Sequence, residues 1–241
     1  MDRQCAFLAA AFFIVHPVQT ESVTYISSRS ELLSTMFVLV ALWIFVRGGP
    51  EKATLVRSLV LLGAFALAML SKETAISLPV GLILLDLAFF SDFQWIGIRK
   101  RWPFYAVFVA AFALGSYWAA TYLTGVVGAG VRGNLTVMQY FATEMRVLLT
   151  YVRLIVLPIS QNLDYDFRIS PGIQDPAVIA SIAVLATIIA GAWIARRSFP
   201  VITYSVLWFF VTLAPTSSIV PIPDVIFEHR LYLPMAGLCL M

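Results

Sequence analysis

Charged side chains are scarce in this chain of 241 residues. Only 12% of the residues are Asp, Glu, Lys or Arg, whereas 61% are hydrophobic. An average soluble domain carries about 25% charged residues, so this composition excludes an ordinary water-soluble globular domain. The formal net charge is only +3, and the basic residues are dispersed between apolar runs. A nucleic-acid-binding face is therefore not expected.

Cysteine and histidine are also rare, with two residues of each. Cys5 and Cys239 both lie inside apolar runs, which is typical of small buried residues. They say nothing about the redox compartment. Carboxylates near His229 follow no known metal-ligand spacing, so we expect no metal site.

Long apolar runs are abundant, and a helix needs about 20 apolar residues to cross a membrane. Clear candidates for crossings are residues 32–46, 102–123, 177–195 and 201–213. The apolar stretch 58–90 is too long for one crossing, and the polar residues 71–74 interrupt it. We interpret it as two short crossings with a bend at Lys72 and Glu73.

The fold class predicted from these runs is all-α, a polytopic transmembrane helix bundle of about 7–8 spans with outer-face interfacial helices. Residues 1–241 form a single transmembrane domain in this interpretation. The run 5–15 meets His16 and Pro17 without a signal-peptide cleavage site. A new apolar run begins at residue 233. Both ends are therefore expected to be cut from a longer protein.

Orientation follows from basic residues in the short loops that flank spans, because such loops stay in the cytoplasm. The residues assigned to the inner side are Arg3, Arg47, Lys52, Arg57, Arg99, Lys100, Arg101, Arg196 and Arg197. The spans at 102–123 and 177–195 then run in opposite directions, so the stretch 138–157 between them does not cross. Its mixture of charged and apolar residues predicts an amphipathic helix along the outer interface.

This topology brings five polar segments to the outer side, at residues 16–21, 28–31, 71–74, 164–166 and 228–230. An ionisable side chain at mid-membrane costs about 2.5–3.5 kcal/mol on insertion scales. Helices carry such groups mainly where they line a cavity or a path. We therefore expect a functional site on the outer side.

Four motifs in order resemble those of the transmembrane-and-tetratricopeptide-repeat proteins. They are residues 16–21 (HPVQTE) with Arg29 and Glu31, then 71–73 (SKE), 163–165 (LDY), and 214–215 (AP) with Glu228 and 231–234 (LYLP). Eukaryotic members of that family are O-mannosyltransferases of the endoplasmic reticulum, with the GT-C fold of polyprenyl-phosphate-dependent glycosyltransferases. Bacterial relatives have a similar membrane domain in the inner membrane. The resemblance implies a polyprenyl- or dolichyl-phosphate sugar as donor, mannose as the expected sugar, and a protein Ser or Thr as acceptor.

The resemblance also suggests roles for the outer residues. A cation at the membrane surface neutralises the leaving phosphate, and Lys72 is the leading candidate, with Arg29 and Arg230 behind it. An acceptor hydroxyl needs a carboxylate base, so Glu21 and Asp164 are the candidate catalytic residues. The predicted substrate-binding set is His16, Arg29, Lys72, Glu73, Glu228, His229 and Arg230.

Each role has a plain structural alternative. Lys72 can extend to water while paired with Glu73, and His16 can simply end a helix before Pro17. Glu21 can cap or orient a turn, and Asp164 can belong to a solvated turn. For the whole chain, the alternatives are a non-catalytic membrane anchor for a repeat domain and a lipid or solute transporter.

The chain departs from the family pattern in three respects. The acidic catalytic motif of the first outer loop is expected upstream of Met1, and the C-terminal tetratricopeptide repeats are not in the sequence. Aligned on Tyr232, His229 occupies the position of the usual Arg, with Arg230 beside it. We therefore expect residues 1–241 alone to transfer no sugar.

Overall fold

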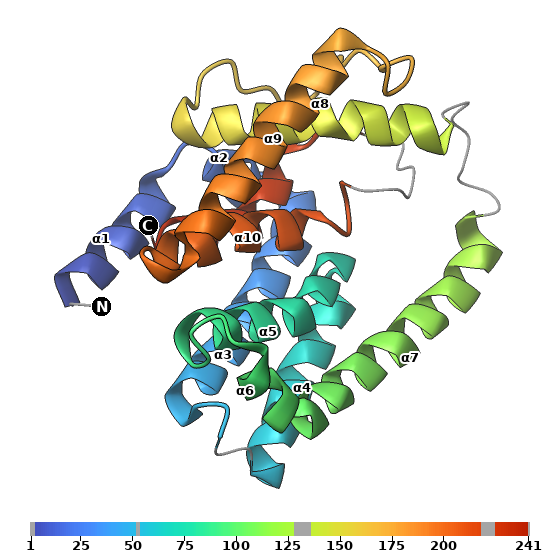
Figure 1. Cartoon of the computed structure of the whole chain (residues 1–241). Helices are drawn as coiled ribbons and strands as arrows, with labels where there is room; N and C mark the ends of the chain where they lie inside the picture. The colour runs from blue at the N-terminus through green and yellow to red at the C-terminus, as the bar shows by residue number, and fades with distance from the viewer. Residues whose placement is uncertain (1–2, 52–53, 128–135, 218–224, 241) are drawn as a thin grey trace.

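The computed structural model describes residues 3–51, 54–127, 136–217 and 225–240, and every regular element in these ranges is a helix. The longer helices are α3 (Arg29–Gly48), α4 (Leu55–Ser71), α5 (Leu78–Phe89), α7 (Trp102–Val127), α8 (Val137–Val156), α9 (Pro176–Ile194) and α10 (Pro200–Leu213). Shorter elements are α1 (Arg3–Val15), α2 (Gln19–Thr24), α6 (Trp95–Lys100), η4 (Glu228–Leu231) and α11 (Tyr232–Leu238). The prediction of an all-α fold is confirmed for the described residues (Figure 1).

The apolar stretch 58–90 is divided where its polar residues predicted a bend. Helix α4 ends at Ser71, and Lys72 adopts an extended backbone with φ −159°. The short 3₁₀ helix η2 (Glu73–Ser77) follows, and α5 then begins with Pro79 in its first turn. Proline suits a first turn because the amide hydrogen that it lacks would have no partner within the helix.

Helices α3 and α4 form a hairpin whose turn uses Gly49 in a left-handed conformation (φ +64°), which glycine adopts at no steric cost. Behind this hairpin, Trp208 of α10 is almost fully buried and donates from Nε1 to the carbonyl of Leu233, at 3.1 Å. A Cβ atom on Gly81 would lie 2.7 Å from the indole ring, and one on Gly237 only 2.1 Å. The two glycines therefore allow α5 and α11 to approach this ring closely.

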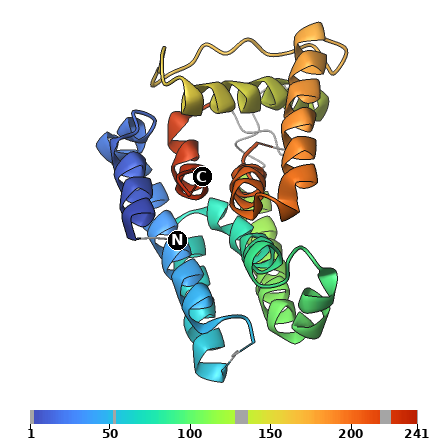
Figure 2. The same cartoon turned by 60° about the vertical axis from the view of Figure 1, so that its left-hand side comes forward.

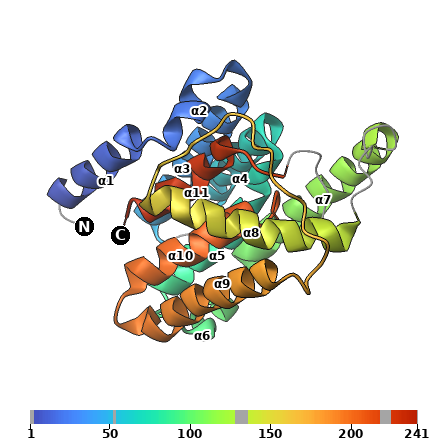
Figure 3. The same cartoon turned by 90° about the horizontal axis from the view of Figure 1, so that it is seen from above.

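Helix α8 lies across one end of the bundle and runs crosswise to α3 (Figure 2). It begins with a capping box, in which Gln139 N donates to Thr136 Oγ1 and Thr136 N donates to Gln139 Oε1. One face is buried, while Arg153 on the other face is exposed. Seen from above, α8 crosses over α10 and α5 (Figure 3). The helix predicted at 138–157 is therefore present, with the expected amphipathic character.

Two stretches of helix among the described residues are long and apolar enough to cross a membrane, Ile26–Gly48 and Pro176–Arg197. Shorter apolar helices are Arg3–Val15, Leu55–Ser71, Trp102–Ala111 and Pro200–Leu213. Length and composition thus support two crossings within the described part of the chain. Lys52, which the topology assigned to the inner side, lies outside the described residues.

The end of the bundle opposite α8 is fixed by a buried carboxylate that the sequence analysis did not single out. Asp86 at the end of α5 is fully buried. Arg101 Nη1 lies 2.5 Å from its Oδ1, Ser91 Oγ donates to it at 2.8 Å, and the Tyr105 hydroxyl donates to Oδ2. These bonds join α5, α6 and α7 at the end where the basic loops were predicted to lie.

Candidate functional site

A carboxylate–histidine pair joins two elements that are about 200 residues apart in sequence. Glu21 of α2 is 6% exposed, and its Oε1 accepts from Nδ1 of His229 in η4 at 2.5 Å. Its Oε2 accepts from the backbone N–H of His229 at 3.0 Å. Ser22 Oγ donates to the carbonyl of the same histidine at 3.4 Å. The first and last motifs of the chain therefore meet at this pair.

The pair fixes the chemistry of the imidazole ring. An ionised carboxylate only accepts hydrogen bonds, so Nδ1 of His229 carries a proton. In the neutral ring, Nε2 then holds the lone pair, and it makes no hydrogen bond within the described residues. Phe227 stacks against the ring, with centroids 4.9 Å apart. A carboxylate that orients a histidine in this way is an arrangement suited to general-base catalysis.

A second buried carboxylate lies beside the first. Glu228 is 3% exposed and accepts three hydrogen bonds. The donors are Gln161 Nε2 at 2.6 Å, the Asn162 backbone N–H at 2.9 Å, and the Tyr165 hydroxyl. Burial and the bond to Glu228 raise the pKa of Tyr165 above its usual value, so Tyr165 stays a hydrogen-bond donor.

These groups surround a cavity of about 160 Å³ that is lined by Thr20, Glu21, Gln161, Asn162, Leu163 and Glu228. We call it the carboxylate cavity. Its size suits a small polar group rather than a whole sugar. The loop after α8 forms one wall, and α2 and η4 form the other.

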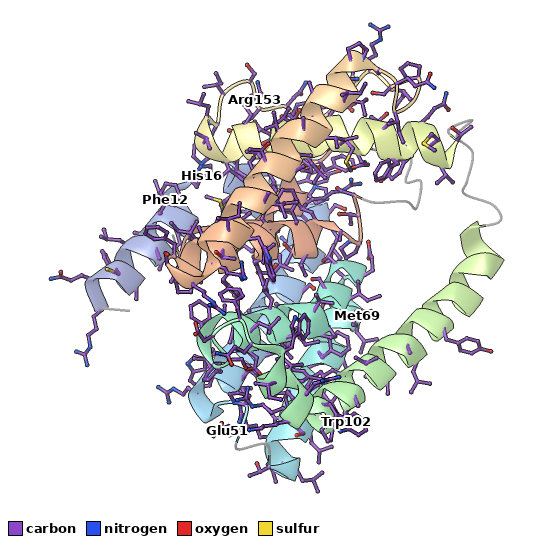
Figure 4. The ribbon with its side chains drawn as sticks, viewed as in Figure 1. Phe12, His16, Glu51, Met69, Trp102 and Arg153 are labelled. Atoms are coloured by element: carbon purple, nitrogen blue, oxygen red, sulfur yellow. The ribbon has the colours of Figure 1, made fainter. Side chains whose placement is uncertain are left out.

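His16 is buried, and both of its ring nitrogens make hydrogen bonds within the chain. The backbone N–H of Val18 donates to Nδ1 at 3.3 Å, so Nε2 carries the proton and lies 3.0 Å from the carbonyl of Ile155. Phe12 packs against the ring edge-on, with centroids 5.2 Å apart (Figure 4). The observed contacts are those of a histidine that ties the α1–α2 connection to the end of α8.

Arg230 is also buried, at 7% exposed, and donates from Nη1 to the carbonyl of Val225 at 3.2 Å. Its guanidinium stands 5.5 Å from the ring of Phe227. Its charge acts on the fully buried carboxyl of Glu144 in α8. Burial raises the pKa of Glu144 to about 7, and the Arg230 charge opposes that increase. Arg230 thus sits inside the protein, not on an open surface.

Lys72 pairs with a different acid from the one anticipated. Its Nζ lies 2.6 Å from Oε2 of Glu31 in the first turn of α3, and Thr74 Oγ1 donates to Oε1 at 3.3 Å. Glu31 is 1% exposed, whereas the Lys72 side chain is 15% exposed. Glu73, the partner expected for the structural alternative, is exposed and has no ion pair among the described residues. The second and third polar segments are therefore brought together as the topology predicted.

Arg29 and Asp164 are both exposed. Arg29 begins α3, and Asp164 lies on the loop after α8 without lining the carboxylate cavity. The Asp164 backbone N–H donates to Oδ1 of Asn162 at 3.3 Å, which is typical of a polar turn. Neither side chain makes a hydrogen bond or ion pair within the described part of the chain.

An apolar cavity of about 480 Å³ opens between α3, α5, α10 and α11. A neighbouring one of about 320 Å³, between α1, α3 and α11, shares Leu39, Ala236 and Leu240 with it. Together these two cavities form what we call the apolar groove. Its lining suits a hydrocarbon chain such as an acyl or prenyl group.

Sequence reasoning included Tyr165 in the 163–165 motif but did not single out Gln161, Asn162 or Glu144 as site residues. Gln161 and Asn162 directly precede that motif, so proximity to it was the available signal. Glu144 belongs to the amphipathic pattern of residues 138–157, and its burial depends on how α8 packs in the folded chain, which local sequence does not encode.

Comparisons with known proteins agree with the motifs. The family model described as dolichyl-phosphate-mannose-protein mannosyltransferase matches residues 1–118. The chain is 27% identical to the Protein O-mannosyl-transferase F38B6.6 of Caenorhabditis elegans, over 98% of the chain and 34% of that protein. It is 35% identical to the Protein O-mannosyl-transferase TMTC3 of Mus musculus, over 32% of the chain and 9% of that protein.

No solved structure matches the chain significantly. The chain spans about a third of the length of the Caenorhabditis elegans relative. The family model, the relatives and the four motifs nevertheless point the same way: this chain is similar to the protein O-mannosyl-transferases, as the motifs predicted.

Proposed function

We propose that the chain is the membrane domain of a glycosyltransferase that moves mannose from a dolichyl- or polyprenyl-phosphate donor to a protein Ser or Thr. The observation that carries this proposal is the Glu21–His229 pair beside the carboxylate cavity. A half-buried, oriented imidazole whose Nε2 makes no hydrogen bond to a described residue is suited to deprotonating a hydroxyl. The printed names of the relatives support the same reaction.

In the proposed reaction, His229 Nε2 takes the proton of the acceptor hydroxyl as its oxygen attacks the anomeric carbon of the donor sugar. The bond from that carbon to the lipid-phosphate oxygen breaks, and the phosphate leaves with the electron pair. Glu21 holds the ring and stabilises the imidazolium that forms. The Asp164 side chain is exposed and makes no hydrogen bond or ion pair with a described residue, so we assign the base to the pair rather than to Asp164.

The apolar groove is proposed to hold the donor's hydrocarbon chain. Lys72 is proposed as the ligand of the donor phosphate, with Arg29 and Arg230 in supporting roles and His16, Glu73 and Glu228 in the surrounding site. An ammonium group has three N–H donors, so Lys72 can keep its contact with Glu31 and still donate to a phosphate. The phosphate then leaves against a fixed positive charge.

The membrane arrangement belongs to the same proposal. Residues 1–241 form one multi-pass transmembrane domain of about 7–8 crossings, with α8 on the extracytoplasmic interface. The domain lies in the endoplasmic reticulum of a eukaryote or in a bacterial inner membrane. The lipid bilayer, the lipid-linked sugar and an acceptor protein are its partners.

The test is a sugar-transfer assay on membranes from cells that express the full-length protein, with dolichyl-phosphate mannose as donor and a Ser/Thr peptide as acceptor. A positioned general base contributes about 10²–10⁴-fold, so Glu21→Gln is expected to lower turnover by about that factor. Asp164→Asn is the matched control and should retain the wild-type rate. Unchanged turnover in Glu21→Gln, at equal expression, would reject the pair as the base, whereas no transfer by the wild type would favour the membrane-anchor alternative.

A further inference from the structure

A second polar cavity, of about 440 Å³, lies between α8, the loop that follows it, and α9. Residues that line it include Arg146, Thr150 and Arg153 from α8, Tyr165 and Phe167 from the loop, and Ser181 from α9. Two of these side chains are cationic, and the lining contains no acidic residue. We call it the arginine cavity.

The two arginines are spaced to act on one ligand. They are seven residues apart on α8, which is about two helical turns, or about 10 Å along the axis, on the same side of the helix. Arg146 Nη1 donates to the carbonyl of Arg168 and to Ser170 Oγ, at 3.0 Å each, and its guanidinium stands 5.1 Å from the ring of Phe167. Arg146 is therefore held in place, while its Nε and Nη2 make no hydrogen bond to described residues.

Arg153 is the second cation of the cavity and is free to bind a ligand. Its side chain is exposed and makes no hydrogen bond or ion pair with any described residue. Figure 4 marks it on α8, at the top of the molecule in this view. Its charge is close enough to act on the Tyr165 hydroxyl. The cavity thus has one fixed and one available cation, and this combination attracts an anion.

The hydroxyls of the lining do not compete for that charge. Thr150 Oγ1 donates to the carbonyl of Arg146 at 3.0 Å, and Ser181 Oγ donates to that of Ala177 at 2.7 Å. Glu228, which accepts from the hydroxyl of the lining residue Tyr165, is already covered by its three donors. Recognition of a ligand therefore rests on the two guanidinium groups, which suit phosphate oxygens.

The surroundings indicate a ligand with an apolar part as well. Helix α9 is one of the two candidate membrane crossings, and only 22% of its most apolar window is buried inside the protein. Ile179 and Val184 are exposed on it. Leu149 and Phe167 add apolar surface inside the cavity itself. A free phosphate would leave this apolar surface unused, whereas a phospholipid would cover it.

We propose that the arginine cavity binds the phosphate headgroup of an anionic membrane phospholipid, whose acyl chains lie against α9. This site is separate from the Glu21–His229 pair and from the apolar groove, and it does not rest on the proposed transferase activity. A bound lipid would pin α8 and α9 together beside the loop that forms a wall of the carboxylate cavity.

The experiment measures lipids retained by the purified protein in nanodiscs that contain equal amounts of phosphatidylglycerol and phosphatidylcholine. We expect phosphatidylglycerol to be enriched in the wild type. One basic residue near an anionic surface contributes about fivefold, so Arg153→Gln should lower the enrichment by about that factor, and Arg146→Gln with Arg153→Gln should remove it. Arg168→Gln is the matched control, since its side chain is exposed, does not line the cavity, and makes no hydrogen bond or ion pair with a described residue.

Arg153→Gln removes no hydrogen bond or ion pair to a described residue, so loss of folding is not expected to obscure the result. Equal retention of the two lipids by the wild type, or equal loss in Arg168→Gln, would overturn the proposal. Displacement of phosphatidylglycerol by millimolar inorganic phosphate would overturn it in favour of a free-anion site. Preferential displacement by dolichyl phosphate would overturn it in favour of a second donor-lipid site.

Discussion

Replacing Glu144 by Gln should stabilise the protein at alkaline pH. Glu144 is fully buried in α8, and burial raises the pKa of its carboxyl from 4.5 to about 7. A group whose pKa is raised on folding holds its proton more tightly in the folded state than in the unfolded chain. Ionisation of Glu144 therefore does not affect the free energy of unfolding below pH 4.5. It lowers the free energy of unfolding progressively as the pH rises from 4.5 to about 7.

Above pH 7 the full decrease in the free energy of unfolding is reached. It amounts to about 3 kcal/mol, since each pKa unit corresponds to about 1.4 kcal/mol. Glutamine has nearly the same shape and no charge, so Glu144→Gln should escape this cost. The pKa of about 7 already includes the opposing effect of the Arg230 charge, which lowers it. Ionisation of Glu144 in the folded protein therefore remains unfavourable.

The assay is thermal unfolding of the purified protein in nanodiscs at pH 5 and pH 8. Wild type and Glu144→Gln should differ little at pH 5, and the variant should unfold at a clearly higher temperature at pH 8. Glu73→Gln is the control, because Glu73 is exposed and has no ion pair with described residues. The reasoning is refuted if Glu144→Gln unfolds at a lower temperature than the wild type at pH 8, or shows the same pH dependence.

Three further changes have defined outcomes. Gly237→Ala should lower the free energy of unfolding by about 1–3 kcal/mol, because its Cβ would lie 2.1 Å from the buried indole ring of Trp208. The control is Gly63→Ala, whose Cβ would meet no atom within 4 Å. It should be neutral or stabilising by up to about 1 kcal/mol in the same unfolding assay. Lys72→Ala should abolish sugar transfer at normal expression, with partial activity in Lys72→Arg, and full activity of the alanine variant would leave only a structural pairing with Glu31. Single cysteines in residues 91–101 should be labelled from the cytoplasm and those in 160–170 from the opposite side, and the reverse labelling would contradict the topology.

Much of the fold was predictable because apolar runs and their interruptions are local properties of the sequence. The bend at Lys72, the amphipathic helix α8 and the apolar helices α3, α7, α9 and α10 all followed from such patterns. The buried Asp86 cluster did not, because its partners lie on the two connections that flank α6 and on α7, and its carboxylate gives no signal within an apolar run.

The candidate site was predictable in membership and much less so in pairing. Topology brought segments 16–21 and 228–230 to one side, and the structure joins them through Glu21 and His229. The partner of Lys72 was wrongly anticipated as the adjacent Glu73, because sequence neighbours were favoured over Glu31 on another helix. Which side chain faces which is set by helix packing, and the sequence pattern does not specify it.

The central claim is that His229 is a base and not a substitute for the arginine that the family usually has at that position. The most direct measurement compares His229→Arg with His229→Gln in the mannose-transfer assay, using membranes that express the gene in full. If Nε2 accepts the acceptor's proton, both variants should lose about 10²–10⁴-fold in turnover, because neither side chain can act as a base near neutral pH. A wild-type rate in His229→Arg would contradict the account, since it would show that the position requires only a positive charge.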